Sequence, residues 1–164
     1  MPREVPCGIS ALSVSLSVAP DGSLTGVCGG EPGAGNQIKS TVHSADGGLT
    51  WAVHLTCGSP SLACSSYPSS NPSTGGYVDQ IDALSDSVAF LVGERNSVQV
   101  TRDGGVSWDP VQPTIGDTAG GPNQLVFFNS SNGIVFGSRS GNGATIWSTS
   151  DGGAHWSSIT PTTT

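Results

Sequence analysis

The sequence predicts an all-β protein built from three repeats of four antiparallel strands. The first observation is a stretch of the form [S/T]-x-D-G-G-x-x-W that occurs three times, at residues 44–51, 101–108 and 149–156. The second is composition: Gly contributes 24 of 164 residues and only 10% are charged, which is typical of short strands joined by many turns. The third is the strict polar–apolar alternation of residues 12–18, which predicts a strand with one buried face.

Each repeated stretch reads as a tight turn between two strands. Glycine reaches positive φ without steric cost, and a short carboxylate accepts backbone N–H groups inside the turn. A carboxylate that holds its own turn has few lone pairs left for chemistry, so we predict structural and not catalytic roles for the shared positions. These are Asp46, Gly48, Trp51, Asp103, Gly105, Trp108, Asp151, Gly153 and Trp156.

The three stretches resemble the Asp-box of the bacterial neuraminidase repeat. Their DGG-x-x-W form is common in β-propellers similar to the photosystem II assembly and stability factor, and in many sialidase-like secreted bacterial proteins. The resemblance covers roughly residues 10–160. Because Asp-boxes occur in enzymes, receptors and assembly factors, the resemblance implies an architecture more strongly than an activity.

The chain divides into three repeats within one domain, residues 1–164. The repeats span approximately 8–56, 77–112 and 123–160, and the Ser-, Pro- and Gly-rich loops 57–76 and 113–122 join them. Expected strands are 12–18, 24–28, 37–43 and 51–55 in the first repeat; 78–84, 87–92, 97–101 and 107–111 in the second; and 124–128, 133–136, 144–149 and 155–159 in the third.

Four antiparallel strands per repeat is the plan of a propeller blade. Successive turn aspartates, Asp46, Asp103 and Asp151, lie 57 and 48 residues apart, which suits one blade per repeat. Closed propellers have about four to eight blades, so three leave two exposed blade faces. We therefore predict an incomplete propeller, covered by self-association or continued in a longer parent chain.

Blade geometry places the DGG turns on the same edge as the turns between first and second strands. The opposite edge then gathers Glu31, Glu94, Arg95 and Arg139, with both arginines equivalently placed after a second strand. Loops at the edge of a rigid scaffold commonly bind partners, so this edge is the candidate ligand-binding surface, with Glu94, Arg95 and Arg139 as its main residues.

All four cysteines lie in the first 64 residues. We favour the disulfides Cys7–Cys28 and Cys57–Cys64 among three possible connectivities, and these imply an extracytoplasmic or secreted protein. Four free thiols in a cytosolic protein is the alternative, whereas the absence of C-x-x-C spacing argues against zinc. The N-terminal residues carry no visible signal peptide, and no apolar run is long enough to insert into a membrane.

The net charge and the placement of the histidines argue against several classes of ligand. A net charge of −7 disfavours binding to nucleic acid or anionic membranes. His43, His54 and His155 lack ligand spacing, so we predict neither a metal nor a cofactor. The favoured function is a non-catalytic module that binds a protein or polysaccharide.

The alternative function is a sialidase-like glycoside hydrolase, or a fragment of one. The resemblance then implies three arginines for the substrate carboxylate, a Tyr–Glu nucleophile pair and an acid/base Asp. The chain offers few such residues, and neither Tyr67 nor Tyr77 has a Glu near it in sequence. Assistance in assembling a membrane complex is a third possibility, by analogy alone.

Overall fold

The computed structural model describes Cys7 and residues 11–34, 36–55, 76–94, 98–113, 115, 122–139 and 143–160. Within these ranges the chain forms three antiparallel sheets of four strands each. The first contains β1 (Ser13–Val18), β2 (Leu24–Gly33), β3 (Asn36–Ser44) and β4 (Ala52–Leu55); the second β5 (Tyr77–Ala83), β6 (Ala89–Glu94), β7 (Gln99–Thr101) and β8 (Asp109–Pro110); the third β9 (Pro122–Phe127), β10 (Gly133–Arg139), β11 (Gly143–Thr149) and β12 (Ser157–Ile159).

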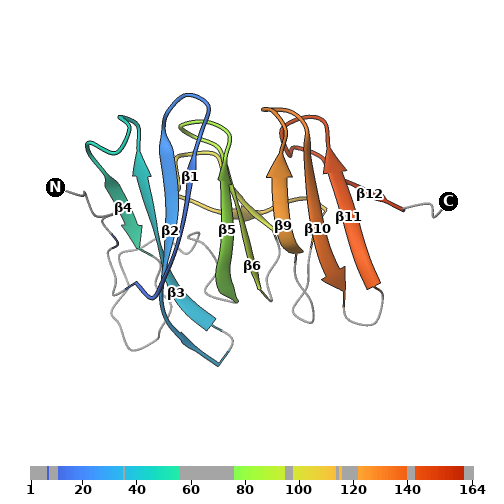
Figure 1. Cartoon of the computed structure of the whole chain (residues 1–164), viewed down its shortest axis with the longest axis horizontal. Coiled ribbons are helices and arrows are strands. Elements are labelled where there is room, and N and C mark those ends of the chain that lie inside the picture. Colours follow the sequence, from blue (N-terminus) through green and yellow to red (C-terminus); the bar gives the residue numbers. More distant parts are fainter. Residues whose placement is uncertain are drawn as a thin grey trace.

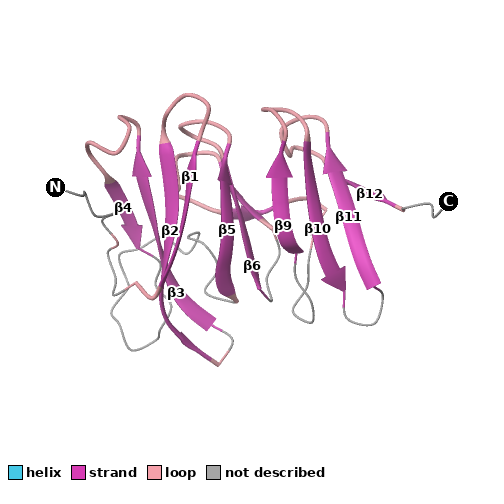
Figure 2. Ribbon diagram, viewed as in Figure 1, coloured by secondary structure: helices cyan, strands magenta, loops and turns pink. Residues whose placement is uncertain are grey.

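The predicted all-β fold is confirmed, and its sheets follow one another along the molecule. Strand order within each sheet is sequential, from β1 to β4, β5 to β8 and β9 to β12. Figure 1 shows the first sheet beside the second and the second beside the third, with the termini at opposite ends. Figure 2 shows strands and loops throughout, and no helix in the described ranges is long and apolar enough to cross a membrane.

The hydrophobic core lies between the sheets, in two clusters. The cluster between the first and second sheets includes Val27, Leu91 and Trp108. The cluster between the second and third sheets is larger and centres on Phe90, whose ring lies 4.9 Å from that of Phe127. The second sheet therefore buries both of its faces, and the first and third sheets each bury one face against it.

The strand predicted from the alternation in residues 12–18 is present as β1, and the face that it turns toward the second sheet is the serine face, not the apolar one. Val14, Leu16 and Val18 are exposed, and the serines of β1 face the second sheet. The reason is hydrogen bonding, because Ser15 and Ser17 accept the backbone N–H groups of β5 at 3.1 and 3.0 Å. The inner edge of β5 would otherwise present unpaired donors.

The seam between the second and third sheets repeats this arrangement with longer side chains. Gln80 Nε2 donates to the carbonyl of Leu125 at 2.7 Å, and the N–H of Leu125 donates back to Gln80 Oε1 at 3.1 Å. Asp82 Oδ2 accepts the N–H of Phe127 at 3.1 Å. Burial raises the pKa of Asp82, against the lowering effect of that hydrogen bond. Side chains of one innermost strand thus complete the edge of the next.

One of the two proposed disulfides is present in the described chain. Cys7 is bonded to Cys28 of β2, with the two Cα atoms 5.8 Å apart. Cys57 and Cys64 lie outside the described residues, as do Arg95 and most of the loops 57–76 and 113–122. The pairing of Cys57 with Cys64 therefore stays a prediction.

Replacing Gln80 with Ala should lower the free energy of unfolding by roughly 1–3 kcal/mol, because it leaves a donor and an acceptor of Leu125 unpaired at the seam. The matched control is Gln124→Ala, which removes the same side chain from an exposed position of β9. Its effect should stay within about 0.5 kcal/mol. Urea unfolding followed by tryptophan fluorescence, at a concentration where the chain is a single copy, measures both, and equal effects would contradict the assignment.

Candidate functional site

The DGG turns lie on one edge of the three sheets, together with the turns between first and second strands (Figure 1). Backbone hydrogen bonds join the two kinds of turn: the N–H of Gly104 donates to the carbonyl of Ser87, and that of Gly152 donates to Ser131. Both glycines have φ of +70°, a conformation that L side chains rarely adopt. The repeated sequence therefore builds the same corner in successive sheets.

Within the first corner, the carboxylate of Asp46 accepts hydrogen bonds on both oxygens. Thr50 Oγ1 donates to Oδ2 at 2.6 Å, and the N–H of Thr50, the N–H of Leu49 and Ser44 Oγ donate to Oδ1. These donors, the Thr50 hydroxyl first, lower the pKa of Asp46 to about 2. The negative charge is thus held by the turn itself.

The other two corners use the same pattern with different donors. Asp103 accepts from Thr101 and Ser107. Asp151 accepts the N–H of His155 at 2.9 Å, and its Oδ2 lies 2.6 Å from His155 Nδ1. The hydrogen bonds from His155, the backbone one first, lower the pKa of Asp151 to about 2. All three carboxylates serve their own turns, and their role as structural residues is the interpretation that we keep.

The three corner tryptophans differ in what they contact. Trp108 and Trp156 are each 4% exposed and pack in the clusters between sheets. Trp108 Nε1 donates to Thr41 Oγ1 of the preceding sheet at 3.1 Å, whereas Trp51 is half-buried and donates to the carbonyl of Gly48 in its own turn. The ring therefore folds back on its glycines in the first corner, while later corners reach the sheet before them.

The Nε1 of Trp156 is buried without a hydrogen-bond partner among the described residues. Counting from the corner aspartates, the place of Thr41 in the first sheet is taken by Val98 in the second. Valine offers no acceptor, which accounts for the unpaired indole N–H.

The opposite edge holds the predicted binding residues only in part. Glu94 ends β6 and Arg139 ends β10, and Glu31 is exposed on β2. The side chains of Glu94 and Arg139 lie outside what the structure describes, and so does Arg95. The backbone brings Glu94 opposite Tyr77 in the β5–β6 ladder, a pairing that sequence distance hides. The binding role of this edge remains a prediction.

The histidines do not converge on one site. His43 Nε2 lies 3.0 Å from Asp86 Oδ1, which links the first and second sheets, and His155 serves the third corner. Burial lowers the pKa of His54. In the part of the chain that the structure describes, no three His, Cys, Asp or Glu side chains are grouped to hold a metal ion.

The chain's single lysine is also withdrawn from solvent. Lys39 of β3 is 2% exposed, and its Nζ donates to the carbonyl of Gly76 at 3.1 Å. Burial lowers the pKa of Lys39 to about 8. A substrate in solvent has no access to this amine, so we assign it a packing role between β3 and the start of the second sheet.

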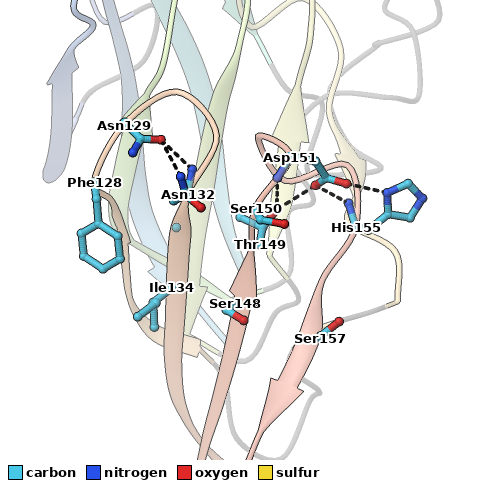
Figure 3. A pocket seen from close by; sticks show the side chains of 11 residues that line it. Phe128, Asn129, Asn132, Ile134, Ser148, Thr149, Ser150, Asp151, His155 and Ser157 are labelled. Atoms are coloured by element: carbon cyan, nitrogen blue, oxygen red, sulfur yellow. Dashed lines mark hydrogen bonds and ion pairs between the residues drawn. The ribbon is translucent and has the colours of Figure 1, made fainter.

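A hollow that the sequence did not indicate lies on the outer face of the third sheet. Its volume is about 620 Å³. Figure 3 shows Phe128, Ile134, Ser148 and His155 around it, beside the third DGG corner. Nothing in the local sequence of these residues marks a site, because the β9–β10 turn, β10, β11, the corner and β12 each contribute to the lining.

Replacing Val98 with Thr should supply an acceptor to Trp156 Nε1 and leave the free energy of unfolding nearly unchanged. The same substitution at Val92, buried in the same cluster, should cost roughly 1–3 kcal/mol because its hydroxyl gains no partner. Urea unfolding of both variants measures the difference. Equal losses would show that Val98 does not occupy the position of Thr41.

Replacing Thr50 with Val should raise the pKa of Asp46 from about 2 toward its ordinary value of 3.8, because the largest stabilising donor is lost. A lowered carboxyl pKa stabilises the fold above the unfolded value, and this contribution disappears as pH falls through the folded value. The variant should therefore lose less stability below about pH 4. Carboxyl titration by NMR provides the measurement, with Asp151 as the internal control that stays near 2. An Asp46 titrating near 3.8 in the unaltered chain contradicts the account.

Comparison with known proteins gives the fold. No family model and no curated protein matches the chain. Among solved structures, the chain is similar to YCF48 bound to a D1 peptide, with 20% identity and a TM-score of 0.55 over 95% of this chain and 42% of that one. It is also similar to the GH74 enzyme of Niastella koreensis, with 20% identity and a TM-score of 0.56 over 90% of this chain and 22% of that one.

The chain therefore spans less than half the length of either matching structure. At this level of identity the likeness concerns the fold alone. Together with the three four-stranded sheets and their sequential packing, it identifies the architecture as β-propeller-like, each sheet forming one blade.

Proposed function

We propose that the chain is a non-catalytic binding module of the Asp-box β-propeller type, which recognises a protein through the loops opposite its DGG corners. The observation that carries the proposal is a difference between the two edges in how their charged groups are used. At the DGG edge, the corner carboxylates are engaged in their own turns. The strand ends at Glu94 and Arg139 lie at the opposite edge, where Arg95 follows directly in sequence.

A protein partner is supported by the matching YCF48 structure, which contains a D1 peptide. Two arginines at equivalent places suit carboxylate groups, because a guanidinium binds a carboxylate with two parallel hydrogen bonds. We therefore propose a peptide segment bearing carboxylates as the ligand, and a polysaccharide as the competing outcome of the test. The Cys7–Cys28 disulfide supports an extracytoplasmic location.

The exposed apolar faces at the two ends of the molecule are also part of the proposal. Val18 of the first blade and Phe128 of the third are 63% and 64% exposed. Apolar surface of this kind commonly marks association. Either self-association or additional blades of a longer parent chain would cover these faces.

The second candidate, sialidase-like glycoside hydrolysis, gains one specific observation. Tyr77 and Glu94 are register partners on adjacent strands, which brings their backbones opposite each other. A Tyr–Glu pair is the nucleophile that the Asp-box resemblance implies for this class. Against it, Arg102 lies in the second corner, at the opposite edge from Arg139.

Selection of a peptide phage library against the intact chain tests the first candidate. Enriched peptides should carry Asp, Glu or a free C-terminus, and their affinity should fall at least about tenfold in the Arg95→Ala/Arg139→Ala double variant, as for a lost charge-assisted pair. Arg102→Ala, on the DGG edge, should leave affinity unchanged.

Peptide binding that is insensitive to the double variant would contradict the proposed edge. A parallel screen against sialosides and aryl glycosides addresses the alternative. Turnover that disappears in Tyr77→Phe would replace the binding module with the hydrolase. Selective retention on immobilised polysaccharide, lost in the double variant, would instead change the class of ligand.

A further inference from the structure

The three blades can be compared residue by residue, because their strands pair in the same register. Three cross-strand pairs occupy the same place in successive blades: Thr25 with His43, Phe90 with Val100, and Ile134 with Ser148. In the first two blades this place faces the next blade, so we call it the seat.

The seats of the first two blades are occupied by the blade that follows. Phe90 packs against Phe127 of β9 and Trp156 of the third corner, with ring centroids 4.9 and 6.2 Å away. In the first blade, His43 contacts Asp86 of the second. A Cβ added to Gly105 or Gly153 would overlap a side chain of the preceding blade, so these corners sit close on their seats.

The hollow on the third blade lies at the same place. Ile134 and Ser148 line it, as do Phe128 and Asn132 (Figure 3). Phe128 donates its N–H to the carbonyl of Asn132, as Ala19 does to Ser23 in the first blade. Ala19 is 3% exposed because the second blade covers it, whereas Phe128 is 64% exposed. The third blade thus has a complete seat on its outer face.

The first blade carries the complementary surface. Val18 corresponds to Phe127 by register, since each closes the ladder between the first and second strands of its blade. Trp51 is half-buried where Trp108 and Trp156 are buried, and a Cβ at Gly48 would meet only Trp51 and Leu24 of its own blade. This corner has the parts of a seated corner, and within the described residues no blade precedes it.

Inner-strand polar residues extend the match. Gln80 bonds both backbone groups of Leu125 in the next blade. Gln124 occupies the position of Gln80, because each lies three residues before the end of the β5 or β9 ladder, and it is exposed. The residue equivalent to Leu125 in the first blade is Leu16, which is also exposed.

We propose that the third blade of one copy of this chain seats the first blade of a second copy. Val18 and Trp51 of the second copy would lie on Ile134, and Gln124 would bond the backbone of Leu16. Two such contacts close a ring of six blades, within the usual range of about four to eight. This inference rests on the proposed covering of the end faces, and is independent of the peptide-binding edge.

We infer a second copy of the chain as the occupant because the proposed contact repeats the two contacts that already join successive blades within one chain. The Cys7–Cys28 disulfide limits the area available. Cys28 pairs with Val14, four residues along β1 from the Val18–Leu24 pair that closes the same ladder. Cys7 therefore lies over the part of this face that is farther from the DGG edge. The contact uses the part beside the first corner.

Light scattering of the disulfide-intact chain tests the proposal. The expected mass is twice 16.4 kDa, lost in both Val18→Glu and Ile134→Glu, because each places a charge in both contacts of the ring. Val106→Glu, at an exposed position in the second corner, should remain a dimer. Mixing the Val18→Glu and Ile134→Glu chains should restore dimers, since one of the two contacts is then free of both substitutions.

A monomer at millimolar concentration overturns the proposal, and so does a dimer that survives either end substitution. Mixed variants that remain monomeric, although circular dichroism shows both folded, also overturn it. The same samples separate this inference from the proposed function. The peptide affinity of the Val18→Glu chain tests the loop edge separately from the ring. Loss of that affinity would count against the proposed loop edge. If the affinity is retained, a failure to form dimers concerns the ring alone.

Discussion

The unpaired inner edge of each blade is the constraint on which the rest of the structure depends. A strand at the edge of a sheet presents backbone donors and acceptors that need partners. Here those of β5 are met by Ser15 and Ser17, and those of β9 by Gln80 and Asp82. Because the partners come from the preceding blade, the blades are fixed in sequence and spacing. Hydrophobic clusters then fill the seams, and the second and third DGG corners lie on the seats so formed.

This constraint also explains how the sequence divides its polar and apolar residues. In β1, the serines serve the seam and the apolar residues face outward at the open end of the molecule. In β5, Gln80 and Asp82 take the place of the serines. In β9, Gln124 and Val126 stand at these positions and are exposed. The chain therefore has ends of different chemistry, which favours a head-to-tail contact over a contact between two like ends.

The sequence predicts the local features well and the contacts between repeats poorly. D-G-G turns and short β-rich segments are recognised from propensity alone, so the strands and the corner hydrogen bonds were predictable. The face that β1 buries was not, because a period of two is equally compatible with either face being covered. The hollow at Ile134 and Ser148 could not be predicted either, because its residues come from separate strands. They are recognised as a seat only by comparison with the equivalent pairs in the other two blades.

For the candidate binding edge, register supplies what sequence spacing cannot. Seventeen positions separate Tyr77 from Glu94, and the β5–β6 ladder places them opposite each other. The sequence predicts equivalent places for Arg95 and Arg139 from the Gly that precedes each by two residues, Gly93 of β6 and Gly137 of β10. The bonded pair Cys7–Cys28 was predictable from clustering in one repeat, and it staples the outer face of the first blade.

Amide hydrogen exchange followed by NMR tests the central constraint most directly. If side chains of the preceding blade complete each inner edge, the amides of Ile81, Ala83, Leu125 and Phe127 should exchange slowly, with opening free energies close to that of global unfolding. In Gln80→Ala, protection of Leu125 should fall while that of Ile81 is retained. Exchange of these four amides at the rate of an open edge strand in the unaltered chain would contradict the account.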